Sequence, residues 1–339
     1  MNIACFHLNQ VGDLVFSLPA LKSVRDSDTE ARITSIVRPG AKDLIESSGL
    51  VDEVILRPTG AKLSKLSLAV ELSSRRFDLA LVFSQSAECA VLAGITRAPR
   101  RIGFVNTSLG SLLTQRVDFS HPPSTANNLR LIEAAGFRPT TTSYAGLLKP
   151  TPAQSERAAE LLAERGVGES SVIAVLAPGT SGRRSLKEWS DSGFAAVGRH
   201  LIRRGCAVAV VGTEPADSVA AQCPGLIDLG GRTSLGDVVG VIARASVLVA
   251  VDSGILHIGA AVGVRVVGLY GPSSPEITGP QGEGHTVLTS GADCSPCVRT
   301  VCKYNRKCMT DISIDAVIAA VDSTLSDPGI RQTLERDGQ

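Results

Sequence analysis

Residues 247–262 have the sequence VLVAVDSGILHIGAAV, in which two structural signals follow one another. The first five residues are continuously aliphatic, as is typical of a strand buried on both faces of a parallel sheet. Residues 255–262 are mostly small and apolar and predict a helix, which begins after the turn Asp252-Ser253-Gly254. The stretch therefore predicts a strand followed directly by a helix, the repeating unit of an α/β fold.

The same alternation runs through the whole chain in two successive sets, separated by prolines at positions 150 and 152 that predict a stiff connector. We therefore expect two doubly wound, Rossmann-like parallel-sheet domains, at residues 1–150 and 151–339, that face each other across a cleft at the carboxyl ends of their strands. The expected strands are residues 3–8, 33–37, 53–56, 79–83 and 101–104, and then 172–177, 207–211, 247–251, 264–270 and 285–288. The expected helices are residues 11–25 and 41–48, and then 191–204, 234–245 and 255–262.

Composition excludes several classes of protein. The 339 residues are 43% hydrophobic and 20% charged, so the chain can build cores and is not disordered. Basic and acidic residues nearly balance, 34 against 33, which excludes nucleic-acid binding through bulk charge. No apolar run reaches the roughly 18 to 20 residues of a membrane span, and the N-terminus lacks the basic region of a signal peptide. We expect a cytoplasmic protein whose slightly basic first half would tolerate peripheral contact with an anionic membrane surface.

The first candidate for chemistry is Asp13, within the stretch NQVGDLVFSLPAL at residues 9–21. It follows a buried strand and stands where an apolar helix begins, so we expect its carboxylate at the strand-to-helix turn. Two roles fit this place and do not exclude one another: an N-cap, worth about 1 kcal/mol to the helix, and a carboxylate that faces a ligand. Gly12 alone does not make the three-glycine dinucleotide fingerprint, which argues against a dehydrogenase.

A second candidate is the stretch LAPGTSGRRSLKEW at residues 176–189. It combines glycines, hydroxyls and cations directly after an expected strand, and these groups together suit a phosphate. The alternative is an ordinary loop with solvated charges. Its Trp189 is the only tryptophan of the chain and is expected to be a packing anchor.

A third candidate is the turn at residues 252–257, where a strand delivers Asp252 to its carboxyl end. The helix that starts at Ser253-Gly254 presents free N–H groups, which suit a diphosphate. His257 lies one turn further on and is either a ligand or a satisfied core histidine. The strand-end turn at residues 268–275 is expected to point into the same cleft.

Four of the eight cysteines, Cys294, Cys297, Cys302 and Cys308, lie within fifteen residues, which we call the cysteine segment (residues 294–308). The other four are scattered and are expected as reduced core thiols. For the cysteine segment, metal ligation, free thiols and disulfides all stay open, in that order of preference in a reducing compartment. Four thiolates suit a tetrahedral zinc or iron ion, and the place near the C-terminus favours a structural role.

Taken together, these segments resemble the heptosyltransferases of glycosyltransferase family 9, inverting enzymes with two Rossmann-like domains (the GT-B fold). The resemblance covers essentially residues 1–321 and depends on the combination of motifs. The matching stretches are residues 11–21, 38–40, 51–54, 178–181 with Lys187 and Trp189, 231–235, 252–254 with His257, 271–272, and the motif Cys-Ser-Pro-Cys at 294–297.

The resemblance implies a role for each matching residue. Asp13 would be the general base that deprotonates the acceptor hydroxyl, and no metal would be needed for catalysis. The donor would be ADP-heptose, and the usual acceptor of the family is the lipopolysaccharide inner core. The donor would be bound by Thr180, Ser181 and Lys187 at the diphosphate, by Asp252, Ser253, Gly254 and His257 at phosphate and sugar, and by Thr233 near the base.

The sequence departs from the family pattern in two places. Residues 182–186 make a longer loop than in some relatives, so the cation that meets the phosphates stays open, and residues 187–190 lack the proline that often follows the tryptophan. Arg97, Arg100 and Arg101 are candidates for an anionic acceptor or for an ordinary solvated face. The alternatives are a GT-B transferase with another nucleotide sugar, or with a protein or small-molecule acceptor, and a non-catalytic nucleotide-sugar-binding module. The oligomeric state stays open.

Overall fold

The computed structural model describes residues 1–326, apart from residues 61, 121–123, 181–184, 298 and 300. The chain forms two compact units: unit 1 is Met1–Leu147, and unit 2 begins at Leu148. The prolines at 150 and 152 stand just beyond this division. Pro152 is the first residue of helix α6 (Pro152–Ala163), a position whose N–H takes no part in the hydrogen bonds of the helix. The side chain of Thr151 caps the helix by accepting from the Gln154 N–H.

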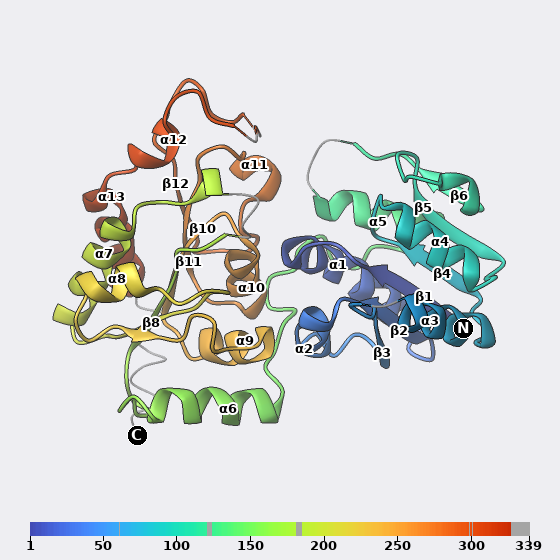
Figure 1. Cartoon of the computed structure of the whole chain (residues 1–339), viewed down its shortest axis with the longest axis horizontal. Coiled ribbons are helices and arrows are strands. Elements are labelled where there is room, and N and C mark those ends of the chain that lie inside the picture. Colours follow the sequence, from blue (N-terminus) through green and yellow to red (C-terminus); the bar gives the residue numbers. More distant parts are fainter. Residues whose placement is uncertain (61, 121–123, 181–184, 298, 300, 327–339) are drawn as a thin grey trace. The chain divides into compact units, whose positions relative to one another are not determined.

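Unit 1 contains a six-stranded sheet in which all the strand pairs are parallel (Figure 1). Its two central strands are buried at every residue except Asn2, as expected for strands of a parallel sheet covered on both faces. The strand order is β3 (Glu53–Leu56), β2 (Arg32–Val37), β1 (Asn2–His7), β4 (Leu79–Val82), β5 (Arg100–Phe104) and β6 (Gln115–Val117). The helices are α1 (Val11–Ser27), α2 (Lys42–Glu46), α3 (Lys62–Ser74), α4 (Ala87–Ile95) and α5 (Ser124–Ala134).

Unit 2 repeats this architecture around its own sheet (Figure 1). Helices α7 (Asp191–Arg203) and α13 (Ile314–Ser326) share one apolar core with the sheet. Gly240 lets two helices of the unit, α6 and α9 (Leu235–Ala243), pack closely, because a Cβ at Gly240 would clash with Gln154 and Ala158. The strand order is β12 (Thr286–Leu288), β11 (Val266–Leu269), β10 (Val247–Val251), β7 (Ile173–Ala177), β8 (Ala207–Val210) and β9 (Ile227–Asp228). The remaining helices include α8 (Asp217–Gln222) and α10 (Gly254–Val262).

The two sheets confirm the predicted fold class of doubly wound, Rossmann-like sheets. Sequence patterns missed the sixth strand of each sheet, β6 and β9, because three and two residues are too few to show a period. In the part of the chain that the structure describes, every helix is too short or too polar to span a bilayer.

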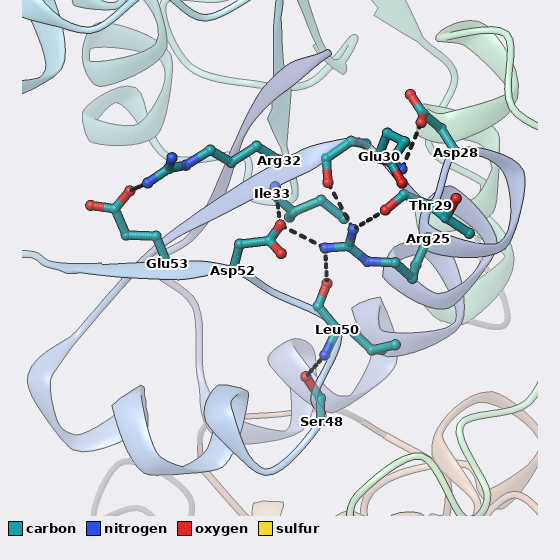
Figure 2. Close-up of polar contacts among 11 residues, drawn as sticks. Arg25, Asp28, Thr29, Glu30, Arg32, Ile33, Ser48, Leu50, Asp52 and Glu53 are labelled. Atoms are coloured by element: carbon teal, nitrogen blue, oxygen red, sulfur yellow. Dashed lines mark hydrogen bonds and ion pairs between the residues drawn. The ribbon is translucent and has the colours of Figure 1, made fainter.

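Arg25, near the end of α1, forms hydrogen bonds at the end of the unit 1 sheet where strands β2 and β3 begin. Figure 2 shows its guanidinium surrounded by acceptors from the segments just before β2 and β3. It donates to the backbone oxygens of Thr29, Ala31 and Leu50 and to Asp52 Oδ2 at 2.6 Å. The same Asp52 oxygen accepts from the Ile33 N–H at 2.7 Å. One side chain thus fixes where two neighbouring strands begin.

The pKa of Asp52 reflects this network. Partial burial would raise it, but the Ile33 amide and the Arg25 guanidinium outweigh burial and hold the pKa below its usual range. A carboxyl group with a lowered pKa stabilises the fold above its unfolded-state pKa and loses this contribution as the pH falls. The network is therefore strongest at neutral pH and weakens in acid.

We expect Arg25→Ala to lower the free energy of unfolding by about 2 kcal/mol, because three carbonyls and a carboxylate lose a charged donor. Urea denaturation at pH 7 measures the change. Arg32→Ala is the matched control: the Arg32 side chain is 66% exposed and forms an ion pair with Glu53 at 3.3 Å, so its loss should cost less than about 0.5 kcal/mol. Equal effects of the two substitutions would contradict the assignment of Arg25 as the anchor of this end of the sheet.

Candidate active site

The candidate site of unit 2 lies at the carboxyl ends of β7 and β10. From these neighbouring strands the chain crosses to β8 on one side and to β11 on the other. Ligands bind α/β sheets at such a switch point, because the diverging crossovers leave a crevice there. Asp252 is the first residue after β10, and Lys187 ends the 3₁₀ turn η3 (Ser185–Lys187) that follows β7.

Three side chains surround the carboxylate of Asp252. Its Oδ2 accepts hydrogen bonds from Lys187 Nζ and from Ser273 Oγ. Its Oδ1 lies 3.6 Å from His257 Nε2. The Asp252 side chain is only 5% exposed and that of Lys187 14%. Residues far apart in the sequence thus form one compact, largely buried ionic cluster.

These contacts determine the charge state of Asp252. Burial alone would raise its pKa, but hydrogen bonds and charge from His257, Lys187 and Ser273 outweigh burial and hold the pKa well below its usual range. Asp252 is therefore ionised at all ordinary pH values and balances the charge of Lys187. This geometry favours a role in which Asp252 holds Lys187 and His257 in place, rather than direct contact with a phosphate, which it would repel.

Helix α10 begins beside this cluster. Ser253 is its N-cap, and Gly254 is its first residue. The Ser253 hydroxyl oxygen is buried and has no hydrogen-bond partner among the described residues. A helix N-terminus attracts anions through its free N–H groups and dipole, so this hydroxyl and the first turn of α10 make a place for a phosphate oxygen.

The other expected donor-site residues of unit 2 are less closely connected. Thr180 Oγ1 donates to Glu188 Oε1 at 3.2 Å, which ties the two ends of the loop around η3. Thr233 precedes the N-cap of α9 and donates to the Leu229 oxygen at 3.3 Å. Ser181 lies outside the described residues. Sequence patterns did not single out Ser273, although the turn that contains it was expected to point at this site.

In unit 1, Asp13 lies just beyond the carboxyl end of β1, in the first turn of α1. It is exposed, and its Oδ2 accepts from the Gln10 N–H at 3.4 Å. The N-cap position is occupied by Gln10, so the interpretation of Asp13 as the N-cap was wrong by three residues. Asp13 closes the first turn from inside the helix and keeps its carboxylate accessible to solvent.

A buried histidine supports the turn between β1 and α1, the helix that carries Asp13. His7 is the last residue of β1; its ring stacks on Phe83 with centroids 4.6 Å apart, and its Nδ1 lies 3.1 Å from Ser17 Oγ. Burial lowers the pKa of His7 to about 3, so the ring is neutral at neutral pH. Asn9 Nδ2 donates to the Phe83 oxygen at 2.7 Å. The loops after β1 and β4 are thus fixed to each other at the switch point of this sheet.

The three arginines considered for the acceptor lie near the amino end of β5, whereas Asp13 lies beyond the carboxyl end of β1. Arg100 begins β5, and its guanidinium donates to the backbone oxygens at the end of α5. Arg101 donates to the oxygens of Ala98 and Leu112. Arg97 takes a left-handed backbone conformation, with φ of 53°, in the turn after α4. Arg100 and Arg101 bind carbonyls at the amino end of β5, so the structure does not bring them to Asp13.

The cysteine segment encloses a cavity of about 440 Å³ lined by Cys294, Cys297, Cys302 and Cys308. Cys302 Sγ accepts from the N–H groups of Tyr304, at 3.3 Å, and Arg306, at 3.2 Å. These two bonds lower the pKa of Cys302 and favour its thiolate. All four cysteines are free, so the structure contains no disulfide here. Within the described part of the chain, no three ligand-type side chains converge closely enough to hold a metal ion.

Comparison with known proteins shows which family has a similar sequence. The sequence model of glycosyltransferase family 9 (heptosyltransferase) matches residues 65–308. Lipooligosaccharide heptosyltransferase 2 of Haemophilus influenzae is 25% identical over 315 residues, which cover 85% of this chain and 88% of that protein.

Solved structures show the same fold. The structure of E. coli ADP-heptose LPS heptosyltransferase II has a TM-score of 0.79 and 21% identity, covering 96% of this chain and 98% of that one. A more distant match is the iron-containing dodecameric glycosyltransferase TibC of enterotoxigenic E. coli. Its TM-score is 0.57 at 15% identity, and the match covers 96% of this chain and 78% of TibC.

We expect Lys187→Met and Asp252→Asn each to lower the free energy of unfolding by about 3 kcal/mol, because each leaves the partner charge buried and unpaired. The double variant should lose clearly less than the sum, since neither charge then remains. Urea denaturation of the four proteins gives the coupling energy of this double-mutant cycle. Additive losses would show that the two side chains do not interact in solution.

Proposed function

Since this chain belongs to glycosyltransferase family 9, the heptosyltransferases, we propose that it transfers a heptose from ADP-heptose to a hydroxyl group of the lipopolysaccharide inner core, with inversion at the sugar carbon. The observation that carries the donor assignment is the cluster of Asp252, Lys187 and Ser273 at the N-terminus of α10. It places an oriented ammonium group beside free helix N–H groups, which together suit a diphosphate.

In this proposal unit 2 binds the donor and stabilises the leaving ADP. Lys187 and the first turn of α10 face the charge that develops on the diphosphate as the bond to the sugar breaks. The buried Ser253 hydroxyl supplies a further hydrogen-bond donor that has no other described partner. We assign Thr180, Ser181, Gly254 and His257 to the phosphate and sugar as well, and Thr233 to the surroundings of the base.

Unit 1 would bind the acceptor, with Asp13 as the general base. As the acceptor oxygen attacks the anomeric carbon, its proton passes to the Asp13 carboxylate, and the bond between the sugar and ADP breaks on the opposite face. One attack from the opposite face inverts the configuration. The exposure of Asp13 supports this role, because an acceptor can reach its carboxylate.

An acceptor of this kind is anchored in a membrane. We therefore propose that the enzyme works in the cytoplasm, in peripheral contact with the inner face of the membrane. Arg97, Arg100 and Arg101 are not part of this proposal, since Arg100 and Arg101 already bind backbone oxygens at the amino end of β5.

We expect Asp13→Asn to reduce heptose transfer by at least about 100-fold, because the amide cannot accept the proton, while donor affinity stays within about twofold because Asp13 does not bind the donor. Transfer is measured on an inner-core acceptor, and affinity for ADP-heptose by calorimetry. Asp28→Asn, just beyond the far end of α1, is the control and should leave both unchanged.

The same calorimetry, with ADP, UDP and GDP as comparators, tests the donor. Selective binding of ADP-heptose and ADP supports the proposal. Preference for UDP or GDP would mean that the donor is another nucleotide sugar, and would leave the assignment of Asp13 as the base unchanged. A protein that binds none of these ligands would contradict the proposed enzyme and leave a non-catalytic module. Normal turnover of Asp13→Asn would refute the assignment of the base alone.

For the cysteine segment we propose a structural zinc or iron ion held by Cys294, Cys297, Cys302 and Cys308. Four thiols on one cavity form the donor set that both metals accept, and the two N–H bonds to Cys302 favour the thiolate that ligates metals. The thiols would have to draw together around the ion. The match to iron-containing TibC supports iron as one of the two candidates.

We expect elemental analysis of the purified protein to find about one zinc or iron ion per chain, as a four-thiolate site binds one ion. Cys302→Ser should lose the ion. Cys206→Ser is the control, since Cys206 is buried in the core of unit 2 and is not among the residues that line this cavity, so this variant should keep the ion. Metal-free protein from cells grown with both metals would overturn the assignment.

A further inference from the structure

The cysteine segment is bonded to both loops that reach Asp252. One loop contains η3 and Lys187, and the other follows β11 and contains Ser273. Both side chains donate to the same oxygen of Asp252, Oδ2. The described residues of the cysteine segment thus hydrogen-bond to both loops that carry the partners of Asp252.

Arg306 makes the contact with the first loop. Its Nη1 donates to the backbone oxygen of Ser185 at 3.2 Å and lies 3.5 Å from that of Glu188. These two carbonyls flank Lys187 on either side in the sequence. A single guanidinium therefore fixes the backbone from which Lys187 extends to Asp252.

The backbone of Arg306 is bound in turn to the thiol cluster. Its N–H donates to Cys302 Sγ at 3.2 Å. Its φ is 57°, and that of the preceding Asn305 is 49°, both in the left-handed region that side chains other than glycine rarely adopt. Such a conformation persists where surrounding contacts maintain it. Here the contacts join a cysteine sulfur to the loop of Lys187.

The second loop is held from the same segment. The Cys297 N–H donates to the Pro272 oxygen at 2.9 Å, and Ser295 Oγ donates to the Gly271 oxygen. Gly271 lies so close to Cys308 and to the next residue, Met309, that a Cβ there would clash with Met309 Sδ and crowd the Cys308 sulfur. Ser273 therefore extends from a backbone that cannot shift independently of the cysteines.

We propose that Arg306 is a positioning residue that holds Lys187 in the donor site. Chemical modification of the thiols in the cysteine segment would then change the affinity for the donor. The assignment of Lys187 to the donor rests on the proposed function. The positioning itself rests on the bonds from Arg306 to Ser185, Glu188 and Cys302.

The test compares Arg306→Ala, Arg306→Lys and the control Arg299→Ala. Arg299 is an exposed arginine of the same segment that lines the same cavity. Arg306→Ala should raise the KM for ADP-heptose about tenfold, the scale of one charged hydrogen bond, with kcat reduced less than about threefold. Arg306→Lys should recover part of the loss, since an ammonium group can still donate to one carbonyl. Arg299→Ala should match the wild type in KM and kcat.

Hydrogen exchange without any ligand gives an independent readout. Peptides covering residues 185–189 should exchange faster in Arg306→Ala than in Arg299→Ala, and treatment of the wild type with a thiol-alkylating reagent should reproduce the faster exchange. Melting temperatures show whether the variants are folded.

The outcomes separate the two proposals. Faster exchange in a protein that does not bind ADP-heptose would overturn the proposed function and keep the positioning role. Unchanged exchange and unchanged KM in a folded Arg306→Ala protein would overturn the positioning role and leave the function standing. A fall in kcat with KM unchanged, or no recovery by lysine, would also overturn it.

Discussion

The candidate site depends on one buried carboxylate. Asp252 follows β10 with almost no contact with water, and an ionised group in such a place must be paired. Lys187 and Ser273 come to it from the ends of two other strands, so a single oxygen joins three loops that the sequence keeps apart. Without these hydrogen bonds the loops after β7, β10 and β11 would not be joined at Asp252, and Lys187 would be an ordinary mobile surface cation.

Most of the fold could be predicted because parallel strands buried on both faces are continuous aliphatic runs. Residues 247–251 were located without error for this reason. Helix α3 was missed because its apolar side chains follow no clear period, and its Leu66 and Val70 are in fact exposed. Helix α6 was missed because the prolines at 150 and 152 indicate a break, whereas Pro152 begins a helix.

The positions of the site residues could be predicted better than their contacts. Asp252 was recognised at a strand end, Lys187 in the loop after a strand and His257 one turn into a helix, and the structure brings the three together. That Asp252 pairs with Lys187 could not be foreseen, because 65 residues separate them and no local pattern encodes the contact. Arg100 and Arg101 show the opposite case: a cluster of charge suggested a ligand, but tertiary structure directs both guanidinium groups to backbone oxygens.

In unit 1, different residues lie at the amino ends and at the carboxyl ends of the strands. Arg25 and Asp52 secure the ends at which strands start, whereas Asp13 and His7 lie where a strand finishes. The hydrogen bonds of Arg25 and Asp52 described above go to residues at or just before the starts of β2 and β3, so substitutions there should leave the carboxyl ends of the strands largely unchanged. A fold arranged in this way can accept different side chains where its strands end while the contacts where they begin stay the same, so one scaffold can present different binding surfaces.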